Sequence, residues 1–232
     1  MHIPDGYLGP TTCAASYAVM IPLWAVASRK LAQSLKSRQV PLLALGSAFS
    51  FVIMMFNVPI PGGTTGHAVG AVLVAVLLGP WAACVAVSIA LIVQALMFGD
   101  GGITALGANC LNMAVIMPFV GYGVYRLIAG ASPTTSRRRW VGAGAGGYVG
   151  LVASAAATGV MFGLQPLLAH DAAGRALYAP YPLSVALPAM LASHLLVFGW
   201  VEALATGLVV AYLQRHAPTL IAATKPAVEV QP

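Results

Sequence analysis

The sequence predicts an all-α integral membrane protein, and its composition carries that prediction. Of the 232 residues, 59% are hydrophobic and only 7% are charged, and the mean hydropathy is +0.88. A soluble domain carries about 25% charged residues, so this composition excludes an ordinary water-exposed fold. The net charge of +6 is typical of basic loops beside a membrane and does not indicate nucleic-acid binding.

Apolar stretches recur along the chain, and we interpret residues 1–232 as a single polytopic domain. A membrane-spanning helix needs about 20 apolar residues. We therefore expect about seven membrane segments, at residues 11–28, 41–57, 68–79, 81–98, 104–128, 140–164 and 183–213. The third segment is short and ends at a Gly-Pro pair that breaks or kinks a helix. Residues 68–98 thus form either two spans or one long broken helix.

The basic residues predict the orientation, because Lys and Arg collect in cytoplasmic loops. Ten of the eleven Lys and Arg residues fall on one side of this map, and only Arg175 falls on the other. We therefore expect the N-terminus outside and the C-terminus inside, with a cytoplasmic tail at residues 214–232.

The first eight residues, Met1-His2-Ile3-Pro4-Asp5-Gly6-Tyr7-Leu8, resemble neither a signal peptide nor a helix start, because no basic residue opens them and Pro and Gly interrupt them. The segment of residues 1–10 contains a chelator. The Met1 α-amine, the His2 amide nitrogen and His2 Nδ1 close two fused rings on one metal ion. Three nitrogens in a plane suit Ni(II) or Cu(II). The alternative is an incidental histidine at position two.

The outer loop at residues 57–67, with the sequence Asn57-Val58-Pro59-Ile60-Pro61-Gly62-Gly63-Thr64-Thr65-Gly66-His67, is the expected source of a fourth donor. It has no helical pattern, and such backbone is tolerated at membrane depth only where protein or water surrounds it. It lies on the expected outer side, together with the N-terminus. His67 is therefore the candidate fourth ligand, and a surface histidine is the alternative.

These two motifs, M-H-I-P-D-G-Y-L and N-V-P-I-P-G-G-T-T-G-H, resemble the substrate-specificity (S) component of nickel and cobalt energy-coupling factor (ECF) transporters. Both match without departure, and the length and hydropathy agree over the whole chain. The resemblance implies a metal held in a square plane by the Met1 amine, the His2 amide and imidazole nitrogens, and the His67 imidazole. The N-terminal segment and the outer loop are then expected to fold together into a central metal site.

The resemblance also implies a function and partners. Ni(II) or Co(II) is the transported substrate, bound with high affinity at a prokaryotic inner (plasma) membrane, and cobalt serves cobalamin synthesis. The implied partners are membrane lipid, a transmembrane coupling (T) protein, two cytoplasmic ATP-binding cassette ATPases and a small accessory membrane subunit. The chain carries no P-loop of its own. The sequence does not distinguish nickel from cobalt.

Other polar residues are weighed between support of the metal and ordinary structure. Asp5 either orients the N-terminal loop or accepts a hydrogen bond from His2. Asn57, Thr64 and Thr65 either hydrogen-bond around His67 or simply form the loop. For the polar residues inside spans, Gln94, Asn109 and Asn112, we expect interhelical hydrogen bonds.

A rival function rests on Glu202, the one acidic residue well inside a predicted span, and on His194, eight residues earlier. Intramembrane ionisable residues suggest a proton relay, which would make the chain a stand-alone proton-coupled metal carrier or channel. An intramembrane metalloenzyme is disfavoured, since no H-E-x-x-H motif occurs. We therefore expect a transport subunit that is not an enzyme.

Overall fold

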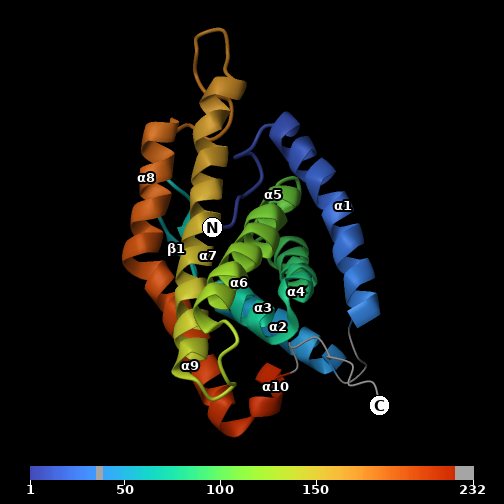
Figure 1. Cartoon of the computed structure of the whole chain (residues 1–232). Helices are drawn as coiled ribbons and strands as arrows, with labels where there is room; N and C mark the ends of the chain where they lie inside the picture. The colour runs from blue at the N-terminus through green and yellow to red at the C-terminus, as the bar shows by residue number, and fades with distance from the viewer. Residues whose placement is uncertain (35–38, 223–232) are drawn as a thin grey trace.

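Apolar helices build most of the fold. The computed structural model of the chain describes residues 1–34 and 39–222 (Figure 1). Within these ranges, five helical stretches are long and apolar enough to span a membrane: Pro10–Gln33, Pro80–Phe98, Leu106–Ala129, Arg137–Leu168 and Leu183–His216. Large hydrophobic side chains are exposed along them, as expected for surfaces that face lipid.

The elements follow in the order α1 (Pro10–Ser34), α2 (Val40–Met54), β1 (Val58–Pro59), β2 (Thr65–Gly66), α3 (Ala71–Leu78), α4 (Pro80–Val93), η2 (Gln94–Phe98), α5 (Leu106–Cys110), η3 (Leu111–Ile116), α6 (Met117–Ala129), α7 (Arg137–Leu168), α8 (Leu183–Ser193), η4 (His194–Phe198), α9 (Gly199–His216) and α10 (Pro218–Ala222). The segments η2, η3 and η4 are π-helical turns inside three of the long stretches. Such turns occur frequently at functional sites, and no sequence pattern predicted them.

All seven expected segments fall on helices, but two of these helices are too short to span a membrane. α2 has 15 residues and α3 has 8, whereas a span needs about 20. α3 is buried over Ala71–Val76, so it is a core helix. Gly79, with φ of +90°, separates α3 from α4. Residues 68–98 therefore form two helices.

The elements that carry basic residues gather toward one end of the bundle. Figure 1 shows the C-terminal ends of α1, α6 and α9 and the start of α7 toward one end, and the loop with Arg175 at the other. The tail expected at 214–232 is helical where it is described, since α9 runs to His216 and α10 follows. Lys36, Arg38 and residues 223–232 lie outside the described residues. Which end faces the cytoplasm stays a prediction.

Glycines bring α7 close to its neighbours. A Cβ on Gly146 would overlap the carbonyl oxygen of Gly121 on α6, and one on Gly150 would lie 2.6 Å from the carbonyl oxygen of Met117. Gly144 faces α9 in the same way. Small residues at four-residue spacing allow backbones to approach this closely. These glycines of α7 therefore serve packing within the bundle.

We expect Gly146→Ala to lower the thermal unfolding midpoint of the protein in detergent, because overpacking a close contact costs about 1–3 kcal/mol. Gly123→Ala is the matched control on α6, since a Cβ at Gly123 meets nothing within 4 Å. The control should keep or raise the midpoint, because Ala favours a helix more than Gly does. Equal midpoints for the two variants would contradict the close contact between α6 and α7.

Candidate metal centre

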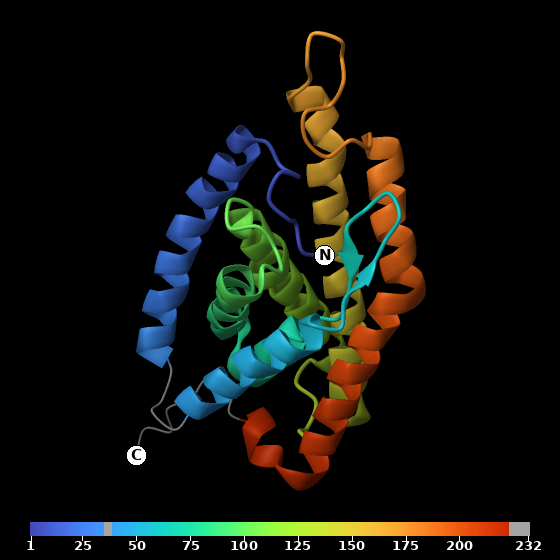
Figure 2. The ribbon, with the colours of Figure 1, turned by 180° about the vertical axis from the view of Figure 1, so that it is seen from behind.

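The N-terminal segment, residues 1–9, runs into the bundle (Figure 2). Pro4 and Gly6 keep it from forming a helix, so other elements must satisfy its backbone groups. The Ile3 N–H donates to Asn109 Oδ1 at 2.9 Å, and Asn109 Nδ2 donates to the Ile3 carbonyl oxygen at 3.1 Å. These two hydrogen bonds fix how deep in the helical bundle Met1 and His2 lie.

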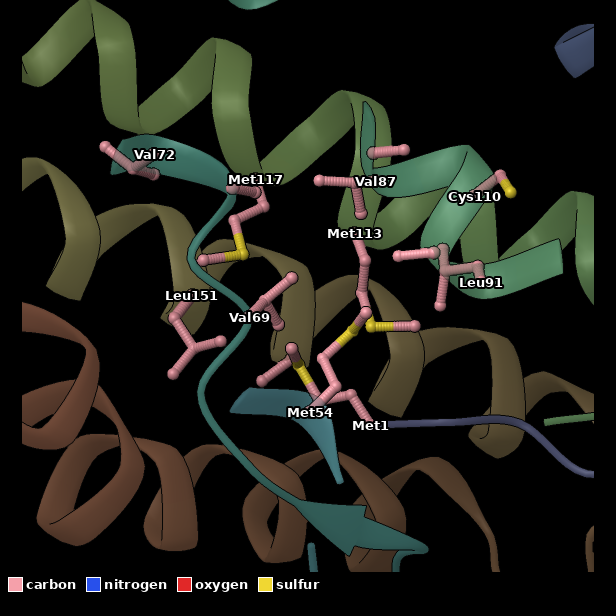
Figure 3. Close-up of a cluster of buried hydrophobic side chains, with 14 of the residues drawn as sticks. Met1, Met54, Val69, Val72, Val87, Leu91, Cys110, Met113, Met117 and Leu151 are labelled. Atoms are coloured by element: carbon pink, nitrogen blue, oxygen red, sulfur yellow. The ribbon is translucent and has the colours of Figure 1, made fainter. Parts of the chain in front are cut away.

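The Met1 side chain anchors the end of the chain in the hydrophobic core. It is fully buried, in a cluster that also contains Met54, Met113 and Leu91 (Figure 3). Complete burial of a Met side chain contributes about 1.5–3 kcal/mol. The α-amine is therefore held in place by the side chain of its own residue.

A short hairpin presents His67. β1 and β2 pair antiparallel, with Val58 opposite Gly66, so the segment expected to be irregular satisfies part of its backbone through strand pairing. A side chain at Gly66 would overlap the Phe198 ring of η4, so the hairpin lies tightly against this helical turn. His67 follows β2 directly and is fully buried.

Two threonines of the hairpin bind the N-terminal segment. The Met1 amine donates to the carbonyl oxygen of Thr65 and to Thr65 Oγ1, the latter at 3.0 Å. Thr64 Oγ1 donates to the carbonyl oxygen of His2 at 2.6 Å. These bonds bring the His2 and His67 rings together, with centroids 4.5 Å apart and planes at 28°.

Each of the two imidazoles has one engaged nitrogen and one free lone pair. His67 Nδ1 lies 3.0 Å from the carbonyl oxygen of Ala68, so Nδ1 carries the proton and Nε2 holds the lone pair. His2 Nε2 lies 3.1 Å from Gln94 Oε1, so its lone pair is on Nδ1. Both lone-pair nitrogens are buried, and neither has a hydrogen-bond partner within residues 1–34 and 39–222.

Gln94 determines the tautomer of His2. Its Nε2 donates to the carbonyl oxygen of Phe51 at 3.3 Å and approaches Met55 Sδ at 3.8 Å. The amide oxygen must therefore face His2 and accept from its Nε2–H. This leaves His2 Nδ1 free, which is the nitrogen that can close a chelate ring with the amide nitrogen of the same residue.

The site differs from a metal site built of side chains alone. Among the described residues, no three His, Cys, Asp or Glu side chains converge on a position where they could hold a metal ion. Two imidazole lone pairs are available, and the Met1 amine lies beside them. With the His2 amide nitrogen, the arrangement offers four nitrogens, a donor set that suits square-planar Ni(II) or Cu(II).

Residues 2–220 match the sequence model of the CbiM family, described as the cobalt uptake substrate-specific transmembrane region. The chain belongs to this family. The match confirms the resemblance that the two motifs indicated, and with the five apolar helical stretches it makes the chain a multi-pass membrane protein of the nickel and cobalt transport family.

Similar proteins of this family are named as metal transporters. The fused nickel transport protein NikMN of Rhodobacter capsulatus is 58% identical over 222 residues, which are 96% of this chain and 64% of the relative. The probable fused nickel transport protein LarMN of Lactiplantibacillus plantarum is 52% identical, over 94% of this chain and 66% of the relative. This chain thus spans slightly less than two thirds of these fused relatives. A crystal structure of a truncated transition metal transporter superposes with a TM-score of 0.90 at 57% identity, over 93% of this chain and 99% of that chain.

In this CbiM-family member, burial keeps the candidate ligands neutral. Burial lowers the pKa of the Met1 amine and that of His67 well below their ordinary values. The pKa of His2 falls to about 3, chiefly because of burial. Charging any of these groups would place a cation in an apolar interior. Their lone pairs are therefore available to a metal ion at neutral pH.

The candidate metal centre includes three of the supporting residues weighed from sequence: Asn57, Thr64 and Thr65. Asn57 reaches it indirectly, since its Nδ2 donates to Asp100 Oδ2 at 3.1 Å. The other oxygen of Asp100 lies 3.5 Å from His2 Nδ1.

Asp5 lies apart from the two imidazoles. Its exposed carboxylate accepts from the backbone N–H groups of Ile103 at 3.2 Å and Thr104 at 2.8 Å. The Thr104 hydroxyl lowers the pKa of Asp5 most, and the two backbone bonds add to this effect. Asp5 thus links the N-terminal segment to the loop before α5.

The candidate metal centre also contains three residues that the sequence analysis did not place there. Gln94 was expected to join helices and does so through the carbonyl oxygen of Phe51 on α2, but it also holds His2. Asn109 was expected to join helices and instead holds the N-terminal segment. Asp100 follows the fourth expected segment, residues 81–98. One signal for Asp100 was present: it lies in a glycine-rich loop expected on the same side as His2.

Glu202 and His194, the pair behind the rival carrier function, have separate partners. The buried Glu202 carboxylate accepts from the N–H groups of Val69 at 2.7 Å and Gly70 at 3.0 Å, at the start of α3, where a negative charge is favoured. His194 Nδ1 bonds to the carbonyl oxygen of Met190 at 2.7 Å. No hydrogen bond joins Glu202 to His194 in the described ranges. Glu202 therefore holds the backbone that follows His67.

We expect nickel binding between about pH 5 and pH 6 to release fewer protons from the folded chain than from a peptide of residues 1–8. Burial lowers the pKa of the Met1 amine and of both imidazoles, so the metal displaces fewer protons from them in the folded chain. A peptide of residues 1–8 is the control. Its exposed amine and imidazole keep pKa values near 8 and 6.5, so it should release about three protons. The slope of log affinity against pH measures both numbers.

The lowered pKa of His2 also determines how the stability of the fold changes with pH. From pH 6.5 down to about 3, the unfolded chain binds a proton on His2 that the folded chain does not. The metal-free fold should therefore lose stability as the pH falls through this window.

For the proton-release measurement, release of three or more protons per nickel ion by the folded chain would contradict a buried, neutral ligand set.

Proposed function

We propose that the chain is the high-affinity substrate-specificity subunit of an ATP-driven ECF-type transporter that takes up Ni(II) or Co(II). The observation that carries the proposal is the pair of buried, stacked imidazoles with their unpartnered nitrogens beside the Met1 amine. Unpaired buried nitrogens are costly, and a metal ion satisfies all of them at once. The relatives named as nickel transport proteins support the same cargo.

The four proposed donors are the Met1 amine, the His2 amide nitrogen, His2 Nδ1 and His67 Nε2. A neutral amine that binds a metal through its lone pair keeps two N–H groups. Thr65 offers two acceptors to this amine, its carbonyl oxygen and its Oγ1. The hairpin therefore matches the metal-bound form of the amine as well as the free form.

The burial of this site supports the proposed partners. Met1 and His67 are fully buried and His2 is 3% exposed, so an ion enters or leaves only when the site opens. The sequence has no ATP-binding loop to drive such opening. We assign that work to a transmembrane coupling protein and two cytoplasmic ATPases, with a small accessory membrane subunit. Uptake by the purified chain alone in liposomes would favour the stand-alone carrier instead.

We expect His67→Ala to lower nickel affinity by at least tenfold, about 1.4 kcal/mol, because it removes the donor that closes the square plane. Competition titration of the purified protein in detergent measures the affinity. His170→Ala, at an exposed histidine in the loop after α7, is the matched control and should bind as the wild type does. A folded His67→Ala protein with unchanged affinity would remove His67 from the site.

A further inference from the structure

Asp100 lies between the proposed nitrogen site and the surface. It follows η2 in the loop that leads to α5, and its side chain is 20% exposed, whereas that of His2 is 3% exposed. The Asn57 amide holds Asp100 Oδ2. The other oxygen, Oδ1, lies 3.5 Å from His2 Nδ1.

This contact joins two acceptors. His2 Nδ1 carries a lone pair, because Gln94 holds the proton on Nε2, and a carboxylate oxygen is an acceptor only. Two facing acceptors repel each other unless a cation lies between them. A first-row divalent ion binds nitrogen and oxygen at about 2.0–2.2 Å, so donors up to about 4 Å apart can hold one ion together. The observed 3.5 Å falls within this range.

We propose that Asp100 is the capture ligand of the transported ion, which it first binds together with His2 Nδ1 and then passes to the four-nitrogen plane. This proposal rests on the proposed function. In the capture step, one carboxylate oxygen and one imidazole nitrogen replace two water molecules of the hydrated ion. The amine and the amide nitrogen then replace further water, and the amide releases its proton to solvent.

Charge supports this order of binding. A hydrated dication meets Asp100 before the buried nitrogens, because Asp100 alone of the two capture donors is substantially exposed. Once the His2 amide has lost its proton, the metal and its four nitrogens carry one net positive charge. The carboxylate of Asp100 then balances that charge within an apolar bundle.

The test is the association rate of Ni(II) with the purified full chain, measured by stopped-flow absorbance. We expect Asp100→Asn to slow association by at least about fivefold, since attraction by fixed charge raises on-rates by about ten- to a thousand-fold. The absorption band of the final four-nitrogen complex should not change. Asp171→Asn is the matched control, since it removes the same charge from an exposed turn where Asp171 pairs with Arg175, and it should associate at the wild-type rate.

Each outcome is decisive. Asp100→Asn protein that associates at the wild-type rate, or that differs only by faster dissociation, overturns the capture role. Wild-type protein without the four-nitrogen band contradicts the proposed function itself, which separates the two failures. If Asp100→Asn does not fold, Asn57→Ala replaces it. This variant keeps the charge but frees the carboxylate, and it should slow association by a smaller factor. Wild-type association by Asn57→Ala would then overturn the capture role.

Discussion

The free α-amine of Met1 is buried beside two neutral imidazoles, and the arrangement of the surrounding elements follows from that burial. A buried polar group without a partner costs about 1–3 kcal/mol, and both His2 Nδ1 and His67 Nε2 are in this condition. The fold tolerates the cost because the Met1 side chain fills a core of methionines and Asn109 holds the adjacent backbone on both sides. A metal ion at these nitrogens removes this cost, and the free energy recovered contributes to the affinity of the site.

The second constraint is that non-helical backbone must be satisfied inside a helical bundle. Residues 1–9 are satisfied by side chains from other elements, and the segment before His67 is satisfied by strand pairing. Beyond His67, the Glu202 carboxylate accepts hydrogen bonds from the N–H groups of Val69 and Gly70, just before α3. The imidazole of His67 is therefore fixed from both sides, by a hairpin packed against η4 and by a buried carboxylate.

The sequence was sufficient to predict the fold class and to predict that residues 1–10 and the loop at residues 57–67 come together. Low charge and high hydropathy predicted the membrane helices. The Pro and Gly residues of the loop at 57–67 and the Gly79-Pro80 pair predicted two places where helices stop. It was not sufficient for α3, whose apolar residues suit a buried core helix as well as a span. The roles of Gln94, Asn109 and Asp100 were also beyond it, because each depends on contacts with residues 2–3, about 90 to 110 positions away. The role of Glu202 was missed for the same reason: its partners, at positions 69 and 70, are distant in sequence.

The most direct measurement of the central claim is nickel binding by a chain with one alanine added before Met1, with mass spectrometry confirming that the alanine persists. The extension turns the Met1 amine into an amide and leaves every side chain of the site in place. The account predicts that high-affinity binding and the four-nitrogen absorption band are both lost. A chain with the same addition after Pro232 should keep both. Wild-type affinity in the N-terminally extended chain would contradict the account.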